Sequence, residues 1–600
     1  MSIMSATVFY TIVYFAGLVA QQRENYAEWS RNGLQGTMKP VSHNFFIAGY
    51  KGLTTSAGWQ VIFLCLFALS VFFVWYKYFK KSKGTLDKER NLTISSEGTY
   101  GTADWMNALD FGKVLRINDI NNIKGIVLGE QKGKAVVLPE DTMLNRHIAV
   151  YGASGTMKSR AFVRPYIFGA VKRGESLIIT DSKGEMFSDT SEYLKKNGYD
   201  VKVFNLVMPE CSDSWNCLSE VEGKELMAQV FTDVIIKNTS QTAKGDAFWD
   251  NAEHNLLKAL VLYVDQNDSP FESEKNMGTV YSLLSNKTND QLDAIFNALP
   301  PVHPAKGPYR LFQQSSETVR GSVIIGLGSR LQVFQNELIC KMTATDEIDL
   351  VKPAKEKCAY FCIISDQDST LEFLSSLFFS FLFIKLVRYA DLKSPHGKCD
   401  IPVNFVLDEF TNTGQILDIN KKMSTIRSRG LNVSIIFQNI AQLKNRYPDD
   451  VWLELVGNCD TQLFLGCTDP MTAEFVSERT GDATVGVTAA QYTKSPITKS
   501  AVYRDSQSVG KRKLLTPDEV LRFPNEEALV ILRGQKPLKV NKLDYTKFPQ
   551  SKELVKSSPA AHIPDWQKGD VPVPNREKEP QERKNRRKAV SGQNVDPDDI

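Results

Sequence analysis

Residues 147–160 read HIAVYGASGTMKSR, an apolar run followed by a glycine-containing turn and a basic segment with a hydroxyl group. The stretch is close to the pattern G-x-x-x-x-G-K-[ST], in which backbone N–H groups and a lysine hold phosphates and the hydroxyl binds Mg²⁺. Gly152, Lys158 and Ser159 stand at the expected positions, but Met157 occupies the place of the second glycine. The stretch predicts either a phosphate-binding loop or a strand-to-helix turn with an incidental lysine.

The phosphate-binding interpretation places a condition on Met157. A non-glycine residue fits this position if its φ is negative and its side chain points away from the nucleotide. The residues expected to surround the phosphates are then Gly152, Ala153, Ser154, Gly155, Thr156, Met157, Lys158, Ser159 and Arg160.

A second apolar run ends in two adjacent carboxylates. Residues 403–410 read VNFVLDEF. In nucleotide hydrolases the first carboxylate of such a pair belongs to the Mg²⁺ shell and the second polarises the attacking water. Asp408 and Glu409 fit these roles in that order, although acidic turn residues after a strand are common. Because parallel strands have their carboxyl ends along one edge, we expect this pair to lie beside the loop.

A third stretch, STIRSRGLNVSIIFQN at 424–439, adds polar groups on both sides of an apolar run. Gln438 follows the run, where its amide can sense a γ-phosphate. Arg427 precedes the run and can act as an arginine finger on the nucleotide of a neighbouring subunit. Solvent-exposed arginines are the alternative. A fourth stretch, IITDSKGEMF at 178–187, places Asp181, Lys183 and Glu185 at the same predicted edge.

The order of apolar runs predicts an α/β fold. Short runs rich in Val, Ile and Phe are separated by segments of helical length, which is typical of a mostly parallel sheet covered by helices. Residues 213–345 differ, because their apolar residues recur at helical spacing, and we interpret them as an inserted helical domain. The expected strands are Ile148–Tyr151, Ser176–Thr180, Val201–Phe204, Ala359–Ile364, Val403–Leu407, Val433–Phe437, Thr461–Leu465 and Ala528–Leu532.

Two uncharged segments near the N-terminus, 3–20 and 58–76, are each about long enough to cross a bilayer. A buried or interfacial helix is the alternative for the first. Six basic residues follow the second, which predicts that this flank is cytoplasmic. Two spans return the N-terminus to the cytoplasm, and residues 21–57 form an external loop. The basic residues of the flank are Lys77, Lys80, Lys81, Lys83, Lys88 and Arg90.

Overall charge and cysteine content exclude little. The net charge is +3, which argues neither for nor against a nucleic-acid partner. Nine cysteines occur without a C-x-x-C pair, and Cys358 and Cys362 lie in or beside an apolar run, which favours buried thiols in a reducing compartment over metal ligands. The end of the chain, including PNREKEPQERKNRRK at 574–588, mixes proline with dense charge and predicts a disordered tail.

Taken together, the stretches DSKGEMF, SVIIGLGSRLQVF, VLDEFTNTGQI, IRSRGLNVSIIFQNIAQLKNRY and GNCDTQLFLG resemble the coupling-protein ATPases of conjugation and type IV secretion, the TraG/TraD-like group. The resemblance covers about 95–545. It implies a RecA-like P-loop motor domain with an inserted all-α domain, preceded by two N-terminal transmembrane helices. The implied organisation is a membrane anchor (1–83), a nucleotide-binding domain in two parts (84–212 and 346–549), the all-α domain (213–345) and a disordered charged tail (550–600).

The resemblance also implies a function. The expected protein is an inner-membrane, multi-pass ATP hydrolase with most of its chain in the cytoplasm, assembled as a homohexamer and using ATP with Mg²⁺. Its expected partners are single-stranded DNA with a bound relaxase and the proteins of a type IV secretion channel. Lys158 and Ser159 correspond to the nucleotide loop, Asp408 and Ser159 to the metal ligands, and Glu409, Lys158, Arg427 and Gln438 to the catalytic set.

The sequence leaves two alternative functions open. The first is a membrane-tethered DNA translocase of the segregation type, although no winged-helix pattern follows Pro549. The second is a non-hydrolysing, nucleotide-switched docking receptor, in which Met157 has impaired turnover. Glu409 argues against the receptor, because a pure switch has no need of a general base.

Overall fold

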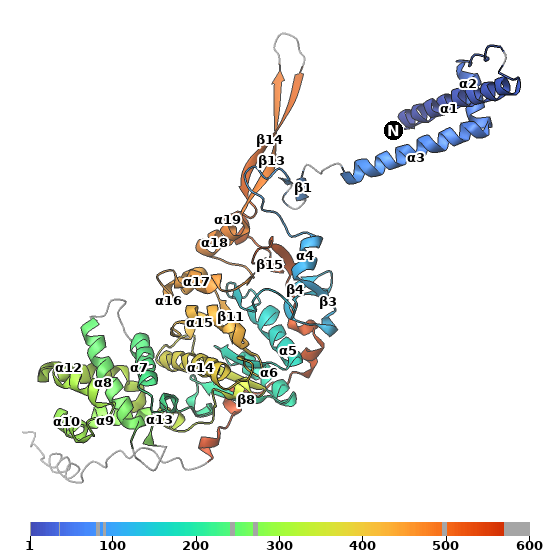
Figure 1. Ribbon diagram of the computed structural model, residues 1–600. Coiled ribbons are helices and arrows are strands. Elements are labelled where there is room, and N and C mark those ends of the chain that lie inside the picture. The colour runs from blue at the N-terminus through green and yellow to red at the C-terminus, as the bar shows by residue number, and fades with distance from the viewer. Residues whose placement is uncertain are drawn as a thin grey trace, which may run out of the picture. The chain divides into compact units, whose positions relative to one another are not determined.

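The computed structural model describes residues 2–34, 36–79, 84–87, 90, 92–239, 247–267, 274–494 and 501–568 (Figure 1). The chain forms two compact units, Met1–Thr99 with Thr484–Gly510, and Tyr100–Ala483 with the chain from Lys511 onward. Each unit is described by itself.

The larger unit is built on a twelve-stranded sheet in the order β3-β5-β4-β16-β15-β12-β6-β11-β10-β7-β9-β8. From β12 to β8 all neighbouring strands pair in parallel, whereas the pairs from β12 to β3 that the register describes are antiparallel. All eight expected strands belong to this sheet. The strands are β3 (Arg116–Asn118), β4 (Ile126–Gln131), β5 (Lys134–Leu138), β6 (Ile148–Tyr151), β7 (Ser176–Asp181), β8 (Asp200–Asn205), β9 (Cys358–Ile363), β10 (Val403–Leu407), β11 (Leu431–Phe437), β12 (Thr461–Phe464), β15 (Glu527–Leu532) and β16 (Leu538–Asn541).

Helices cover both faces of the parallel strands, which explains why those strands are apolar without alternation. In β6, Ile148 and Val150 join one core with residues of α5 (Arg164–Arg173) and α6 (Glu185–Lys196). Ala149 and Tyr151 join the other core with α14 (Glu372–Leu392). The sheet is therefore the middle layer of an α/β sandwich.

Other helices connect or follow these strands. They are α4 (Ala108–Val114), η2 (Ser159–Val163), η8 (Phe410–Asn412), α15 (Ile419–Thr425), η9 (Ile426–Arg429), α16 (Ile440–Arg446), α17 (Val451–Gly457), α18 (Pro470–Thr480), α19 (Pro517–Leu521) and η10 (Tyr545–Lys547).

Between β8 and β9 the described elements are all helical, and Figure 1 shows them in green beside the sheet. Apolar residues at helical spacing meet in this region, with Leu256 and Leu260 of α8 fully buried. The α-helices are α7 (Glu225–Thr239), α8 (Ala247–Asp265), α9 (Met277–Asn286), α10 (Asn289–Ala298), α11 (Lys306–Gln313), α12 (Glu317–Arg330) and α13 (Glu337–Met342).

The smaller unit contains helices α1 (Ser2–Arg31), α2 (Phe45–Thr54) and α3 (Ser56–Phe79). The expected external loop at 21–57 is largely helical, because α1 continues to Arg31 and α2 follows. Small residues allow α1 and α2 to approach closely, since a Cβ added at Gly17 would lie 1.7 Å from the carbonyl oxygen of Ala48. Backbone approach at small residues is typical of helices that pack within membranes.

The same unit contains a four-stranded sheet in the order β1-β2-β13-β14. It joins β1 (Gly84–Asp87) and β2 (Leu92–Ser95) to two long strands, β13 (Asp482–Lys494) and β14 (Ala501–Lys513). Residues 84–95, which we expected in the nucleotide-binding domain, therefore pair elsewhere. The sequence interpretation was wrong here because β13 and β14 have few large apolar residues and were not recognised as strands.

Two described helices are long and apolar enough to cross a membrane. Ser56–Trp75 has a mean hydropathy of 2.2 and a largely exposed surface. Glu372–Leu392 has a mean hydropathy of 1.5, but it is the core helix α14 and is buried by protein. The other expected span, 3–20, lies within α1, which does not meet the same criterion among the described residues.

The C-terminal strap, residues 549–568, corrects the expected tail. Its three short 3₁₀ turns are Pro549–Glu553, Pro559–Ala561 and Asp565–Gln567, and Trp566 is only 8% exposed. The prediction of a tail rests on the average composition of residues 550–600, in which these few anchoring residues do not stand out. The charged stretch 574–588 lies outside the described residues.

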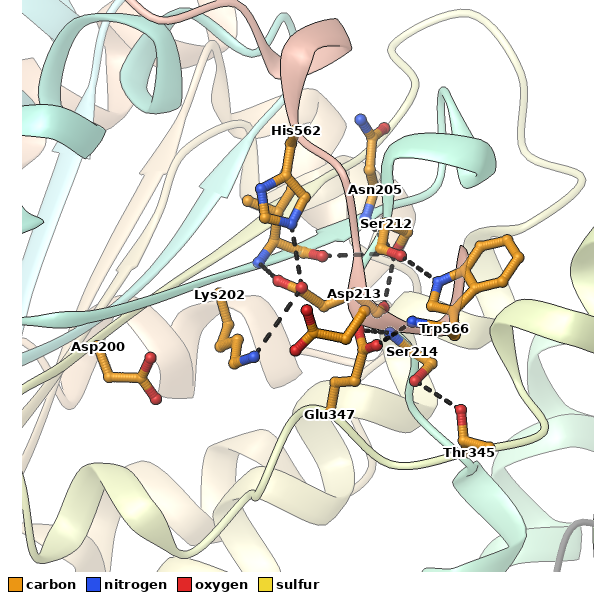
Figure 2. A network of polar contacts seen from close by, with 12 residues as sticks. Asp200, Lys202, Asn205, Ser212, Asp213, Ser214, Thr345, Glu347, His562 and Trp566 are labelled. Carbon is orange, nitrogen blue, oxygen red and sulfur yellow. Dashed lines mark hydrogen bonds and ion pairs between the residues drawn. The ribbon is translucent and has the colours of Figure 1, made fainter. Parts of the chain in front are cut away.

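The chain crosses from the sheet into the helical region near Ser212 and Asp213 and crosses back near Glu347. Figure 2 shows that the strap contacts both of these crossings. The indole N–H of Trp566 donates to the Ser212 carbonyl at 2.7 Å, and its backbone N–H donates to Glu347 Oε1 at 2.5 Å. His562 Nε2 lies 3.0 Å from Asp213 Oδ1. Ser212 and Asp213 precede the helices α7–α13 and Glu347 follows them, so the strap joins the two crossings.

Replacing Trp566 tests this anchoring role. Trp566→Ala removes a buried ring and its bond to Ser212, and we expect a loss of about 3 kcal/mol in unfolding free energy. Thermal unfolding of the full-length chain should show a clearly lowered Tm. Lys568→Ala, which alters an exposed ion pair of the same segment, should leave Tm nearly unchanged. An unchanged Tm for Trp566→Ala would contradict the anchoring role.

Candidate active site

Four strand ends bring the sequence-predicted polar residues to one edge of the sheet. The loop at 152–159 follows β6, Gln438 follows β11, and Asp408 with Glu409 follows β10. These three strands are parallel neighbours, and β7, which ends at Asp181, pairs with β10. A cavity of about 440 Å³ lies among these polar residues, and Gln438, which is not in its lining, donates to the Glu409 carboxylate. The lining residues of the cavity are Ser154, Gly155, Thr156, Met157, Lys158, Ser159, Arg160, Arg164, Asp181, Ser182, Lys183, Glu185, Met186, Asp408, Glu409 and Tyr545.

The loop begins at Gly152, where a side chain would clash with its neighbours. A Cβ at Gly152 would lie 2.4 Å from Thr156 Oγ1 and 3.0 Å from Leu465 Cβ, so only glycine fits without rearrangement. The Ala153 N–H donates to the Gly466 carbonyl at 3.0 Å, which ties the loop to the end of β12. After the loop the chain enters one π-helical turn, η2, and continues as α5.

Met157 departs from the sequence expectation, because its φ is +69° rather than negative. A side chain in the left-handed region costs roughly 1–2 kcal/mol per residue. The Met157 carbonyl accepts from the Ala161 N–H at 2.7 Å, so the helix begins directly after the turn. This chain thus adopts, with a methionine, a backbone conformation that favours glycine.

Lys158 lies in the cavity but is not free in this state. Its side chain is buried, and Nζ donates to the carbonyls of Gly152 at 2.9 Å and Ala153 at 3.4 Å. Glu409 Oε1 lies 3.8 Å from the same ammonium. The lysine therefore rests on the loop's own backbone, within reach of the cavity and of one carboxylate.

The two carboxylates differ in environment. The Asp408 carboxylate accepts the Glu409 backbone N–H at 3.0 Å, and the Asp408 carbonyl accepts from Thr180 Oγ1 at 2.5 Å. Burial, followed by the adjacent charge of Glu409, raises the pKa of Asp408 to about 7, while Lys158 opposes the rise. Additional positive charge beside the two carboxylates would therefore stabilise the ionised form of Asp408.

Glu409 is held toward the cavity by its backbone and by Gln438. Its φ of +48° is left-handed, as at Met157. The Gln438 amide donates to both oxygens of the Glu409 carboxylate, at 3.2 and 3.1 Å. The residue predicted to sense a phosphate therefore also orients the predicted base.

Asp181 organises the segment that follows β7. Its carboxylate accepts backbone N–H groups from Lys183 at 3.3 Å, Glu185 at 3.1 Å and Phe187 at 2.9 Å. Burial raises the pKa of Asp181, and these N–H groups oppose the rise. Asp181 shapes the wall of the cavity by holding the first turn of α6.

Arg427 is not part of this cluster within one chain. It belongs to η9, which precedes β11, whereas the loop follows the parallel strand β6. The seven residues of β11 therefore separate Arg427 from the edge with the loop and cavity by roughly 20 Å. Its guanidinium donates to the Met143 carbonyl at 3.1 Å.

Several cavity residues were not predicted. Arg164 Cζ lies 4.9 Å above the Tyr545 ring, and Arg160 Nε donates to Asp544 Oδ2 at 2.7 Å. Helical spacing from Arg160 could have indicated Arg164. The segment around Tyr545 lies almost four hundred residues along the chain, and no local pattern marks it.

The donors fit a Mg²⁺–nucleotide better than a metal held by protein alone. Among the described residues there is no cluster of three or more His, Cys, Asp or Glu able to hold a metal ion. Ser159 offers one hydroxyl and Asp408 one carboxylate at the cavity. Mg²⁺ in phosphate sites characteristically combines one or two protein ligands with phosphate oxygens and waters.

Comparison with protein families gives one match across most of the chain. The family model described as "Type IV secretory system Conjugative DNA transfer" matches residues 104–565. Similar curated proteins are Protein VirD4 of Rhizobium radiobacter, 23% identical over 476 residues, and the conjugal transfer protein TraG of Escherichia coli, 24% identical over 400 residues. The matches span 77% and 63% of this chain, but only 66% and 62% of those proteins.

Solved structures show the same fold. The plasmid coupling protein TrwB in complex with ADP and Mg²⁺ aligns with a TM-score of 0.54 at 17% identity, covering 77% of this chain and 99% of that one. TrwB in complex with the non-hydrolysable ATP analogue ADPNP aligns at 0.53 and 17% identity, covering 74% and 97%. The large unit therefore shares the α/β fold of TrwB, with an associated helical region, which agrees with the fold that the sequence resemblance implied.

Proposed function

Because this chain belongs to the type IV secretory system conjugative DNA transfer family, we propose that it is a membrane-anchored coupling ATPase. In this proposal it recruits a relaxase–DNA complex and drives or gates transfer of that complex into a type IV secretion channel. The observation that carries the proposal is the single cavity that holds the loop, Lys158 and the Asp408–Glu409 pair.

Nucleotide binding would begin with an exchange of partners at Lys158. Its Nζ now lies on the Gly152 and Ala153 carbonyls, and the β- and γ-phosphates of ATP would replace them. The loop residues from Gly152 to Arg160 would surround the phosphates, and N–H groups other than those of Gly152, Ala153 and Thr156, which already donate to carbonyls, would bind them. Support comes from TrwB, whose structures contain ADP with Mg²⁺ or an ATP analogue.

Hydrolysis is assigned to Glu409 as the general base. Its carboxylate lies at the cavity and is held by Gln438, so it can accept a proton from a water aimed at the γ-phosphate. Loss of the γ-phosphate would be passed to Gln438 through Glu409, because the Gln438 amide donates to that carboxylate. Gln438 is therefore proposed as the sensor.

Mg²⁺ would be held by Ser159 and Asp408 together with the phosphates, and when bound it would neutralise phosphate charge. The high pKa of Asp408, raised by burial and by Glu409, fits a carboxylate whose natural partner is a cation. Asp181 has no such assignment, because backbone N–H groups already occupy its carboxylate.

Membrane anchoring is proposed for the first unit. Ser56–Trp75 is apolar and largely exposed, and Trp59 and Trp75 stand near its ends. We assign residues 3–20 of α1 as a second span, packed on α2 and α3 through small residues. The basic residues after Tyr76 then place the bulk of the chain on the cytoplasmic side of the inner membrane.

The partners follow from the family and are part of the proposal. A homohexamer would place subunit interfaces at the nucleotide cavities, and single-stranded DNA would pass through its centre. A relaxase on that strand would dock before transfer, and the secretion channel would receive the complex. A segregation-type translocase and a non-hydrolysing receptor are the competing functions.

ATPase measurements on the full-length chain in detergent test the assignment. We expect Glu409→Gln to lower kcat about 10²-fold or more while ATP affinity is retained, because only the general base is lost. Lys158→Ala should instead weaken ATP binding, because the phosphates lose their cation. Single-stranded DNA should stimulate the native enzyme. The exposed Glu356→Gln serves as the matched control.

The competing functions give different results in the same assay. If native protein and Glu409→Gln bind ATP and share one background rate, the hydrolysing motor is refuted and the docking receptor is favoured. If double-stranded DNA stimulates and single-stranded DNA does not, the segregation-type translocase is favoured.

A second prediction concerns Arg427, for which we propose a role as arginine finger on the neighbouring subunit's nucleotide. Its position at the edge opposite the loop excludes action on its own ATP. Arg427→Ala and Glu409→Gln should each abolish turnover, yet their equimolar mixture should regain activity, since about a quarter of interfaces would pair an intact base with an intact finger. Turnover rates of the mixed assemblies report this directly.

Arg429, on the same 3₁₀ turn as Arg427, provides the control. Arg429→Ala, which removes an arginine bonded to Asp391 in its own chain, should not be complemented in this way. If the mixture of Arg427→Ala and Glu409→Gln stays as inactive as its components, Arg427 does not act across the interface.

A further inference from the structure

The loop needs a left-handed backbone at a position where its sequence has no glycine. Met157 is left-handed at φ +69°, where the usual pattern has glycine. The peptide between Thr156 and Met157 therefore keeps an orientation that a methionine disfavours. Within the loop, the Thr156 hydroxyl and N–H contact Ala153 at 2.8 and 3.3 Å. These contacts close the turn before Met157 but do not hold the carbonyl of Thr156.

A buried lysine from a distant segment holds that carbonyl. Lys542 follows β16, is 7% exposed, and its Nζ donates to the Thr156 carbonyl at 3.0 Å. It also donates to the Leu465 carbonyl at 2.7 Å and lies 3.4 Å from Asn525 Oδ1. One ammonium thus joins the loop to the end of β12, next to the Gly466 carbonyl that accepts from Ala153.

The geometry of a peptide links this contact to phosphate binding. The C=O and N–H of a trans peptide point in opposite directions, so a carbonyl held by Lys542 sends the Met157 N–H to the other side of the loop. If the peptide flipped, the φ of Met157 would become negative. The carbonyl oxygen would then occupy the place of a donor, and successive N–H groups are what make such a loop an anion site.

We propose that Lys542 is a positioning residue that holds the Thr156–Met157 peptide in its phosphate-binding orientation, in place of the freedom that a glycine at 157 would give. The inference rests on the proposed nucleotide binding. This role explains why a cation is buried here. The described hydrogen-bond partners of Lys542 are carbonyl and amide oxygens. Burying a cation with such partners costs desolvation free energy that an apolar residue would not cost.

A double-mutant cycle at residues 157 and 542 tests the inference. The full-length chain, Lys542→Met, Met157→Gly and the double variant are titrated with Mg²⁺–ADP carrying a fluorescent label, and Tm is recorded for each. Lys547→Met is the matched control, since that lysine lies in the same segment, is half exposed and pairs with Glu130.

A specific pattern of dissociation constants is expected. Lys542→Met should weaken ADP binding about tenfold or more, equivalent to about 1.4 kcal/mol. In the Met157→Gly background the same change should weaken binding less than about threefold, because glycine adopts the left-handed conformation without help. Lys547→Met should bind ADP as the native chain does.

Other results overturn the inference. An equal loss in both backgrounds would show that Lys542 contributes to binding or folding independently of Met157. If Lys542→Met does not fold, Met157→Gly must restore both folding and ADP binding, and failure to restore them refutes the role. If the native chain itself does not bind Mg²⁺–ADP, the proposed function fails and this inference with it. Native binding without coupling refutes the inference alone.

Discussion

The parallel pairing of β6, β11 and β10 is the constraint on which the site depends. Neighbouring parallel strands end at the same edge, so stretches far apart in the chain deliver Lys158 and Glu409 to one cavity and Gln438 to the Glu409 carboxylate. Burial on both faces keeps these strands in register, because a slip of one residue would exchange the side chains of the two cores. The same rule places Arg427 at the opposite edge, and thus directs its proposed action to another subunit.

Two residues with strained backbone lie at this edge. Met157 and Glu409 both have positive φ, although neither is glycine. Strained residues persist where the surroundings determine them, and each has such surroundings here: Lys542 and the loop contacts at Met157, Gln438 and Lys158 at Glu409. The electrostatics beside Glu409 agree, since it is adjacent to the buried Asp408 carboxylate and lies 3.8 Å from the Lys158 ammonium. Burial and the neighbouring Glu409 charge raise the pKa of Asp408, and a cation accompanying a phosphate would oppose both effects.

The sequence predicted the parts of this structure that local pattern encodes. Apolar runs and their polar ends identified eight of the twelve strands of the large sheet, because burial and parallel pairing leave those marks directly. The strands β3, β4, β5 and β16, at one end of the sheet, were not predicted. The pattern did not reveal the sign of φ at Met157, which depends on contacts made by Lys542 and Ala161. Nor did it reveal the strap, where Trp566 is anchored by groups more than two hundred residues away. Long strands of polar residues, such as β13, also escape a search for apolar periodicity.

The most direct test of the central claim is a structure of the full-length chain with Mg²⁺ and a non-hydrolysable ATP analogue. The account predicts that the triphosphate lies in the cavity, that Lys158 Nζ has left the Gly152 and Ala153 carbonyls for phosphate oxygens, and that Met157 keeps its positive φ with Thr156 still bonded to Lys542. A nucleotide bound elsewhere, or a loop in which Met157 turns to negative φ as the phosphates enter, would contradict it.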